Sequence, residues 1–162
     1  MVEGEEMANS NSRSSSTSNN SASNSDYINM SEQDRIAVEL LKVLMNANTI
    51  SFMSDILSMQ ATINGINSIY NKYTENKINV YNPDERALYS IYIGIFSRLI
   101  VTGVGYRKYE LAYKSLMNGD NTVNINNFIK INFANAVLLF GALIASGVAK
   151  NIYDNGRLNI FV

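Results

Sequence analysis

Apolar residues recur at intervals of three and four positions through most of the chain beyond residue 30, a spacing typical of amphipathic helices. The first such stretch begins at the run Ser31-Glu32-Gln33-Asp34, which resembles a capping box. Its apolar stripe continues to Tyr73, although the polar residues 46–49 interrupt it and Gly65 weakens its second half. Because no proline cuts this stretch, the sequence allows either one long bent helix or two shorter helices.

The strongest local signal in the chain is the run Asn82-Pro83-Asp84-Glu85. Asn82 can cap a helix, proline suits the first helical position, and the two acids complement the positive end of the helix dipole. The sequence therefore predicts a helix that starts at Pro83 and runs to about Met117. We expect it to stop at Asn118-Gly119, where glycine can adopt the left-handed conformation.

A third helix is predicted to begin between Asn124 and Asn127 and to end at the run Asp154-Asn155-Gly156. Segments with strand character are scarce, and no fixed-period repeat suggests a solenoid. The pattern thus predicts an all-α fold, a bundle of three to four long helices. We expect residues 31–157 to form this helical domain and residues 158–162 to form an apolar C-terminal tail.

Residues 1–30 have a different composition, rich in serine and asparagine. Such a segment cannot bury enough apolar surface to offset the entropy lost on ordering, so we expect a disordered N-terminal tail. Its acidic start at Glu3, Glu5 and Glu6 is not followed by an apolar segment, and a signal peptide is therefore not expected.

Charge is sparse in the helical part of the chain. The whole sequence has 13 Lys and Arg and 14 Asp and Glu, and the acids are concentrated before residue 36. The remainder is mildly basic, but its Lys and Arg residues are scattered, which argues against nucleic-acid binding. A domain so poor in charge must cover its apolar surface with itself, with further copies, or with lipid.

Two segments are long enough to cross a bilayer and are largely apolar. Residues 87–106 contain a single charge, Arg98, and residues 131–149 contain none. A central arginine is costly in a membrane, and Asn132 and Asn135 shorten the apolar part of the second segment. The tyrosines around residues 87–106 are typical of a membrane interface but equally of a protein interface. The distribution of Lys and Arg favours neither topology.

Several small residues in these segments are candidate packing or interface positions, because glycine inside a helix is costly unless it permits close approach. Together with Arg98, these candidates are Gly94, Gly103, Gly141 and Ala145. Gly105 raises the same expectation of tight helix contact.

Arg98 also has a candidate ion-pair partner, Asp55, the only charge between residues 43 and 71. If the first two helices form an antiparallel pair around residues 74–82, residue 98 faces roughly residue 61. The two charges would then lie about 9 Å apart along the helix axis. Solvent exposure of either residue is the alternative.

The residue types exclude several kinds of chemistry. The chain has no cysteine and no histidine, which removes thiolate and imidazole ligands and the usual nucleophile–base pairs. Asp84 and Glu85 are explained by helix capping, and Gly103-Val104-Gly105 lacks the rest of a nucleotide-binding fingerprint. We therefore expect no catalytic site, no metal, no cofactor and no small-molecule substrate.

Two hypotheses about function remain. The first is a non-enzymatic helical structural or interaction protein that forms a homo-oligomer, binds a protein partner or belongs to a larger assembly, in the cytoplasm or bound to that assembly. The second is a small membrane protein in which residues 87–106 and 131–149 form a helical hairpin. Recovery without detergent would separate the first hypothesis from the second.

Overall fold

The computed structural model describes residues 30–120 and 122–155. The predicted N-terminal tail and the final apolar segment lie outside the described residues. The chain divides between Met30 and Ser31, and the unit that starts at Ser31 contains all the helices described.

Three long helices make up the described part of the chain: α2 (Glu32–Tyr70), α3 (Pro83–Met117) and α4 (Ile125–Asn155). The predicted all-α fold is confirmed. α2 is a single helix of 39 residues, so the polar run at residues 46–49 does not break it. The bounds of α3 and α4 agree with the sequence pattern to within a residue or two.

The helix ends have the chemistry that the sequence predicts. The Ser31 hydroxyl accepts a hydrogen bond from the Asp34 backbone N–H at 3.1 Å, and the Asn82 side chain accepts one from the Asp84 N–H at 2.9 Å. Pro83 occupies the first turn of α3. Gly119 ends this helix region with a φ of +92°, a conformation that favours glycine.

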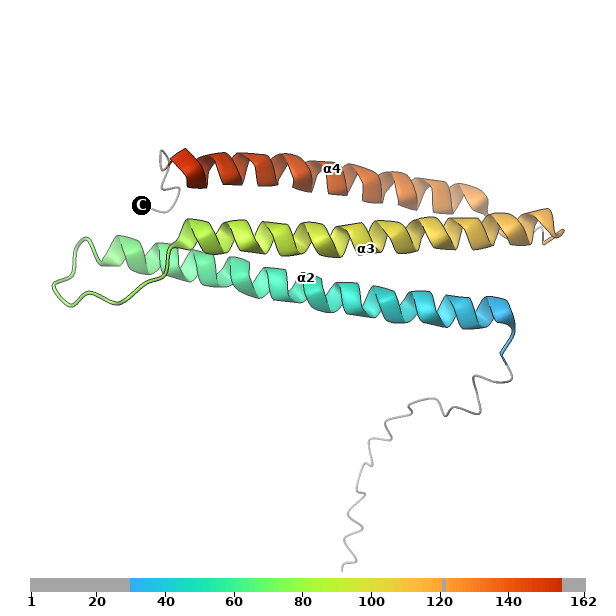
Figure 1. Ribbon diagram of the computed structural model, residues 1–162, viewed down its shortest axis with the longest axis horizontal. Coiled ribbons are helices and arrows are strands. Elements are labelled where there is room, and N and C mark those ends of the chain that lie inside the picture. The colour runs from blue at the N-terminus through green and yellow to red at the C-terminus, as the bar shows by residue number, and fades with distance from the viewer. Residues whose placement is uncertain (1–29, 121, 156–162) are drawn as a thin grey trace, which may run out of the picture. The chain divides into compact units, whose positions relative to one another are not determined.

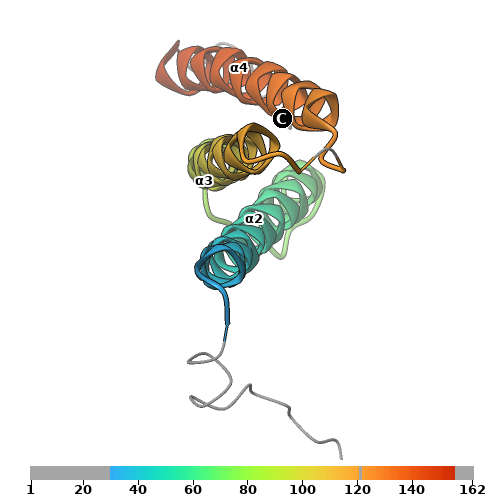
Figure 2. The same ribbon diagram turned by 90° about the vertical axis from the view of Figure 1, so that its right-hand side faces the viewer.

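α3 is the central helix of the three, and both neighbours run antiparallel to it (Figures 1 and 2). It packs against α2 on one side and against α4 on the other, whereas α2 and α4 hardly contact each other. The predicted bundle is therefore made of three helices, arranged as an open row with α3 in the middle. Among the described helices, each of the two outer ones therefore has only α3 as a close neighbour.

Candidate functional site

The contact between α2 and α3 is made by small side chains. Ala47 and Ala61 on α2 are 0% and 2% exposed, and three buried serines accompany them. Two of these serines donate hydrogen bonds across the contact, Ser54 to the Ser90 carbonyl and Ser97 to the Ala47 carbonyl, each at 2.7 Å. Small residues and hydroxyls of this kind let two helix backbones approach closely.

Gly94, one of the candidate packing positions, lies on this same contact. A Cβ atom added to Gly94 would lie 3.1 Å from the Ser54 hydroxyl oxygen. That is tighter than an ordinary van der Waals contact, so the missing side chain makes room for Ser54.

The contact between α3 and α4 depends on a different glycine, Gly105. A Cβ added there would lie 2.5 Å from Asn132 Oδ1 and 3.2 Å from Asn135 Nδ2. Asn132 Oδ1 is buried and accepts no hydrogen bond from the described residues. α4 therefore approaches α3 closely at a place where a polar atom is left unsatisfied.

The other small residues singled out in the sequence do not lie at a close helix contact in the part of the chain that the structure describes. A Cβ at Gly103 or Gly141 would meet nothing within 4 Å, and Ala145 is exposed. The reason is helical rotation. Gly103 and Gly105 are two residues apart, about 200° around the helix axis, so only one of them can face α4.

The structure does not form the proposed ion pair between Asp55 and Arg98. Both residues are exposed, and no ion pair joins them in the part of the chain that is described. The serine hydrogen bonds place Ala47 beside Ser97, so Arg98 faces residue 46 and not residue 61. Asp55 is then nine residues from that level, about 13 Å along the axis.

The predicted alignment of α2 with α3 was wrong because of how the connection between them folds. The Asn71 side chain exchanges hydrogen bonds with the backbone of Ile78, and Arg86 donates to Gln60 Oε1 at 2.7 Å. α3 therefore begins beside Gln60, and the last turns of α2 extend past it (Figure 1). The sequence-based estimate assumed a symmetrical turn.

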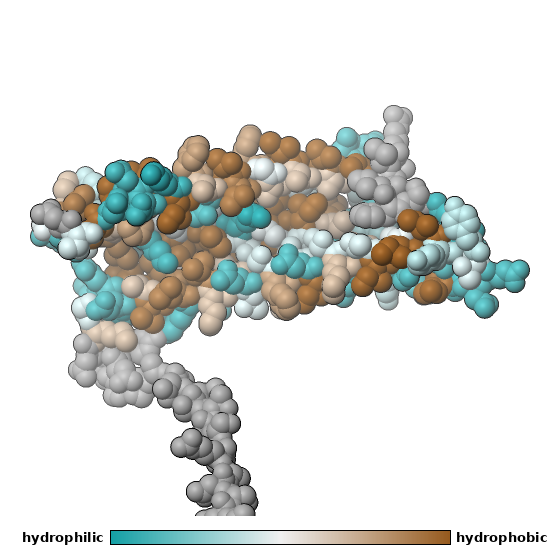
Figure 3. All heavy atoms as spheres, turned by 180° about the vertical axis from the view of Figure 1, so that it is seen from behind, coloured by the Kyte–Doolittle hydropathy of each residue, from teal (hydrophilic) through white to brown (hydrophobic). Residues whose placement is uncertain are grey.

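Large apolar side chains face outward on all three helices. Examples are Phe52 on α2, Phe96 on α3 and Phe140 on α4, which are 63%, 56% and 65% exposed. α4 has no buried residue at all. Apolar side chains cover much of the face seen in Figure 3. Thus most of the buried residues are small or polar, with Leu88 and Val104 as the larger exceptions, while most of the large apolar residues are exposed.

The charged residues delimit an apolar band across α3 and α4. Arg86 and Arg107 enclose twenty residues of α3, and Lys130 and Lys150 enclose nineteen of α4. Each segment is about 30 Å long at 1.5 Å per residue. Because Gly105 lies beside Asn132 and the helices are antiparallel, the two segments coincide to within about one turn. Arg98 is the only charge on α3 or α4 inside the band.

The charges of α2 lie toward the edges of the same band. Ser54 is bonded to Ser90, which places Asp55 near the Arg86 end. Glu39 and Lys42 pair at 3.0 Å on the side of Arg107. The middle of the band therefore has Arg98 as its one charge on the described helices.

Three of the four exposed tyrosines of α3 lie at or beyond the edges of the band, and the fourth, Tyr92, lies about halfway between an edge and the middle. Tyr89 and Tyr92 lie near Arg86, and Tyr106 and Tyr113 lie near or beyond Arg107. Tyr89 and Tyr106 are about 25 Å apart along the helix. Tyrosine is enriched where a hydrocarbon layer meets water, because one end of its ring is apolar and the other polar.

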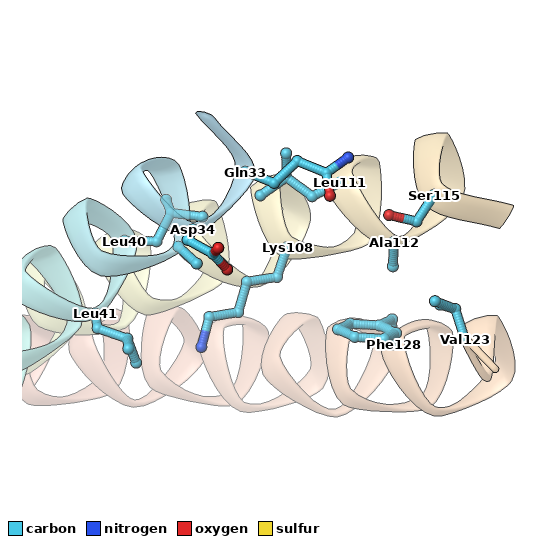
Figure 4. Close-up of a pocket in the computed structure, with 11 residues that line it drawn as sticks. Gln33, Asp34, Leu40, Leu41, Lys108, Leu111, Ala112, Ser115, Val123 and Phe128 are labelled. Atoms are coloured by element: carbon cyan, nitrogen blue, oxygen red, sulfur yellow. The ribbon is translucent and has the colours of Figure 1, made fainter. Parts of the chain in front are cut away.

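A groove runs along α3 between α2 and α4. Three adjoining cavities of about 450, 300 and 230 Å³ lie in it. The first and second share Lys108 and Phe128, and the second and third share Val101 and Asn135. Together they extend from Ser97 to Ser115 on α3, about 27 Å. Figure 4 shows residues that line the outermost cavity, with Lys108 reaching from α3 toward α4, the helix that carries Phe128.

Nothing in the described residues forms a metal site, since no three His, Cys, Asp or Glu side chains cluster there. In the connection between α3 and α4, Asp120 accepts hydrogen bonds from the Thr122 hydroxyl at 2.6 Å and from the Thr122 N–H at 3.0 Å. These two bonds stabilise the carboxylate and hold the pKa of Asp120 below its ordinary value.

No family model matches this chain, and comparison with curated proteins and with solved structures finds no similar protein. Structure alone therefore defines its class. It is an all-helical protein whose three described helices are each long enough and apolar enough to cross a membrane.

Proposed function

We propose that this chain is an integral membrane protein in which α2, α3 and α4 cross the bilayer side by side. One observation carries the proposal: the residues buried between the helices are mostly small or polar, while most of the large apolar residues face outward in a band about 30 Å long. That length corresponds to the hydrocarbon core of a bilayer. A water-soluble bundle would place its large apolar residues inside.

The position of the polar residues supports the same proposal. Tyrosines lie near both edges of the band, and the charges of α2 lie away from its middle, with Lys42 the furthest inside at about 7 Å from the level of Arg107. Three crossings would put residue 31 and residue 155 on opposite sides of the membrane. This proposal includes a third membrane helix, α2, which the sequence-based hairpin left outside.

We also propose that the protein acts without catalysis, because the groove is lined by none of the usual nucleophile–base pairs.

Membrane extraction tests the proposal directly. We expect the full-length chain to stay in the membrane pellet at alkaline pH and to be released by detergent. Leu143→Arg places a charge on the outward face of α4 near the middle of the band, at a cost of roughly 2.5–3.5 kcal/mol on insertion scales. It should lower the membrane-bound fraction.

Thr122→Arg is the matched control, because it adds the same side chain to the connection outside the band. It should leave the membrane-bound fraction unchanged. Recovery of the unmodified chain in the soluble fraction without detergent would refute the membrane proposal.

A second candidate function is self-association, favoured by one observation on α4. Gly141 and Ala145 are both exposed and lie four residues apart, which leaves a flat strip where another helix could approach. Light scattering in detergent would give the mass of the protein in the micelle. If copies associate through this strip, Gly141→Ile should lower that mass and Gly103→Ile, on α3, should not.

A further inference from the structure

The inner part of the groove is polar at the depth where a bilayer is least polar. Arg98 and Thr102 on α3 line its innermost cavity together with Asn48 and Ser51 on α2 and Asn135 on α4. Along the axis of α3, Arg98 lies about 2 Å from the middle of residues 87–106. Side chains of this kind are rare at such a depth and are typical of functional sites.

These polar groups have few partners within the chain. The Thr102 hydroxyl donates to the Arg98 carbonyl in its own helix. The side chains of Arg98, Asn48 and Asn135 make no hydrogen bond or ion pair with any residue that the structure describes. In hydrocarbon, unsatisfied donors of this kind cost several kcal/mol each. The groups therefore need water or a polar ligand.

The charge of the groove specifies what that ligand is. Neither of the two inner cavities is lined by an aspartate or glutamate, whereas Lys108 lines one of them and Arg98 lines the other. Asp34 lines only the outermost cavity, where it accepts a hydrogen bond from Ser31. The guanidinium and the two amides, which have no partner among the described residues, can all donate hydrogen bonds, and donors with positive charge recognise anions.

The groove also provides a route to Arg98. The outermost cavity reaches Gln33 and Ser115, near the polar ends of α2 and α3, and adjoins the inner cavities through shared residues. Even the innermost cavity, at about 230 Å³, exceeds the roughly 30 Å³ that one water molecule occupies in liquid water.

We propose that the groove between α2 and α4 is a water-filled cleft that admits a small anion, such as a halide or a carboxylate, and binds it at Arg98. The inference rests on the proposed function, because only membrane depth makes these polar groups costly. It gives a role to Arg98 that no partner within the described chain supplies.

The absence of cysteine from the sequence makes the test simple, since an introduced cysteine is the only thiol. Thr102→Cys and Asn135→Cys place a thiol in the groove, whereas Leu99→Cys and Val137→Cys place one on the outward face at similar depth. Each full-length variant is reconstituted into proteoliposomes. It is then treated with an anionic sulfonatoethyl or a cationic trimethylammonioethyl methanethiosulfonate, with rates normalised to a free thiol.

We expect the two groove thiols to react and the two outward thiols to stay unmodified, because these reagents need a thiolate in contact with water. Even with the dielectric constant of bulk water, one positive charge at about 6 Å from the charge of the reagent should make the anionic reagent about tenfold faster than the cationic one. Arg98→Gln should abolish this preference. Arg98→Lys keeps the charge and should keep the preference, which separates a charge effect from a folding effect.

Each of the other outcomes contradicts the cleft, the anion site or the membrane proposal separately. If none of the four thiols reacts, the cleft is refuted and the membrane proposal stands. If the groove thiols react without preference for either reagent, the anion site is refuted. If the outward thiols react as fast as the groove thiols, the helices are not embedded in lipid and the proposed function fails as well.

Discussion

The two faces of α3 meet their neighbours in opposite ways. Toward α2, the contact buries alanines and serines, and two hydroxyls donate across it to backbone carbonyls. Toward α4, the contact centres on Gly105, leaves Asn132 Oδ1 unsatisfied and borders an open groove. α2 and α3 thus form a hairpin held by the chain itself, whereas the position of α4 depends more on what surrounds it.

This difference explains where function can reside. Tight, satisfied contacts resist change, whereas a polar groove between loosely coupled helices can take up water or a ligand. If this comparison is correct, the same kind of substitution should change the free energy of unfolding more at a close helix contact than at an exposed position.

The largest effect is expected where the α2–α3 contact is tightest. Ala47→Leu adds a bulky side chain at a position that is 0% exposed, so the helices must separate. We expect it to lower the free energy of unfolding by about 1–3 kcal/mol, measured by chemical unfolding in detergent micelles. Ala145→Leu makes the same change at an exposed position of α4 and should change it by less than about 0.5 kcal/mol. Equal effects would mean that α2 and α3 do not pack as described.

A second pair of substitutions tests the contact between α3 and α4. Gly105→Ala places a methyl group 2.5 Å from Asn132 Oδ1, so we expect destabilisation of about 1 kcal/mol or a shift of α4. Gly103→Ala meets nothing within 4 Å and should stabilise the helix by roughly 0.5–1 kcal/mol, measured in the same way.

The cause of the Gly105→Ala effect can be isolated with a double-mutant cycle. Adding Asn132→Ala removes the atom that the new methyl group would meet, and most of the lost stability should return. If the double variant is as unstable as the sum of its parts, the strain lies elsewhere.

The sequence predicted the helices well because their ends have distinct local chemistry. Ser31, Asn82, Pro83 and Gly119 each act within a few residues, so capping and turn rules place the helix bounds closely. The sequence could not predict the register between α2 and α3. Register depends on how residues 71–82 fold back, and no local pattern encodes the hydrogen bonds between Asn71 and Ile78.

The contacting glycines were only partly predictable for a related reason. α3 is apolar around most of its circumference, so periodicity does not reveal which face meets α2 and which meets α4. Gly94 lies at a contact and Gly103 does not, although both lie in the same kind of sequence. The groove was not predicted either, because its polar residues come from three helices and share no motif.

A smaller effect is expected for the hydroxyls that join α2 and α3. Ser97→Ala removes the hydrogen bond to the Ala47 carbonyl, and such bonds between membrane helices average about 0.6 kcal/mol. Ser146→Ala is the control, because its hydroxyl donates to Leu143 within the same helix. Ser146→Ala should lower the free energy of unfolding by less than Ser97→Ala. A larger loss at Ser146 would mean that the bond between α2 and α3 stabilises the fold less than a bond within α4.

The smallest effect should come from the connection between α3 and α4, through the pH dependence of stability. Because its folded-state pKa is lowered, Asp120 stabilises the fold while it is ionised, above its unfolded pKa of about 4. That contribution is lost as the pH falls through the lower folded-state pKa. Melting curves in detergent at pH 7 and pH 3 should therefore show a larger decrease for the unmodified chain than for Asp120→Ala. Thr122→Val, which removes the donating hydroxyl, should reduce the decrease in part, since the backbone N–H still donates. An identical decrease in all three proteins would mean that this connection does not contribute to holding α4 against α3.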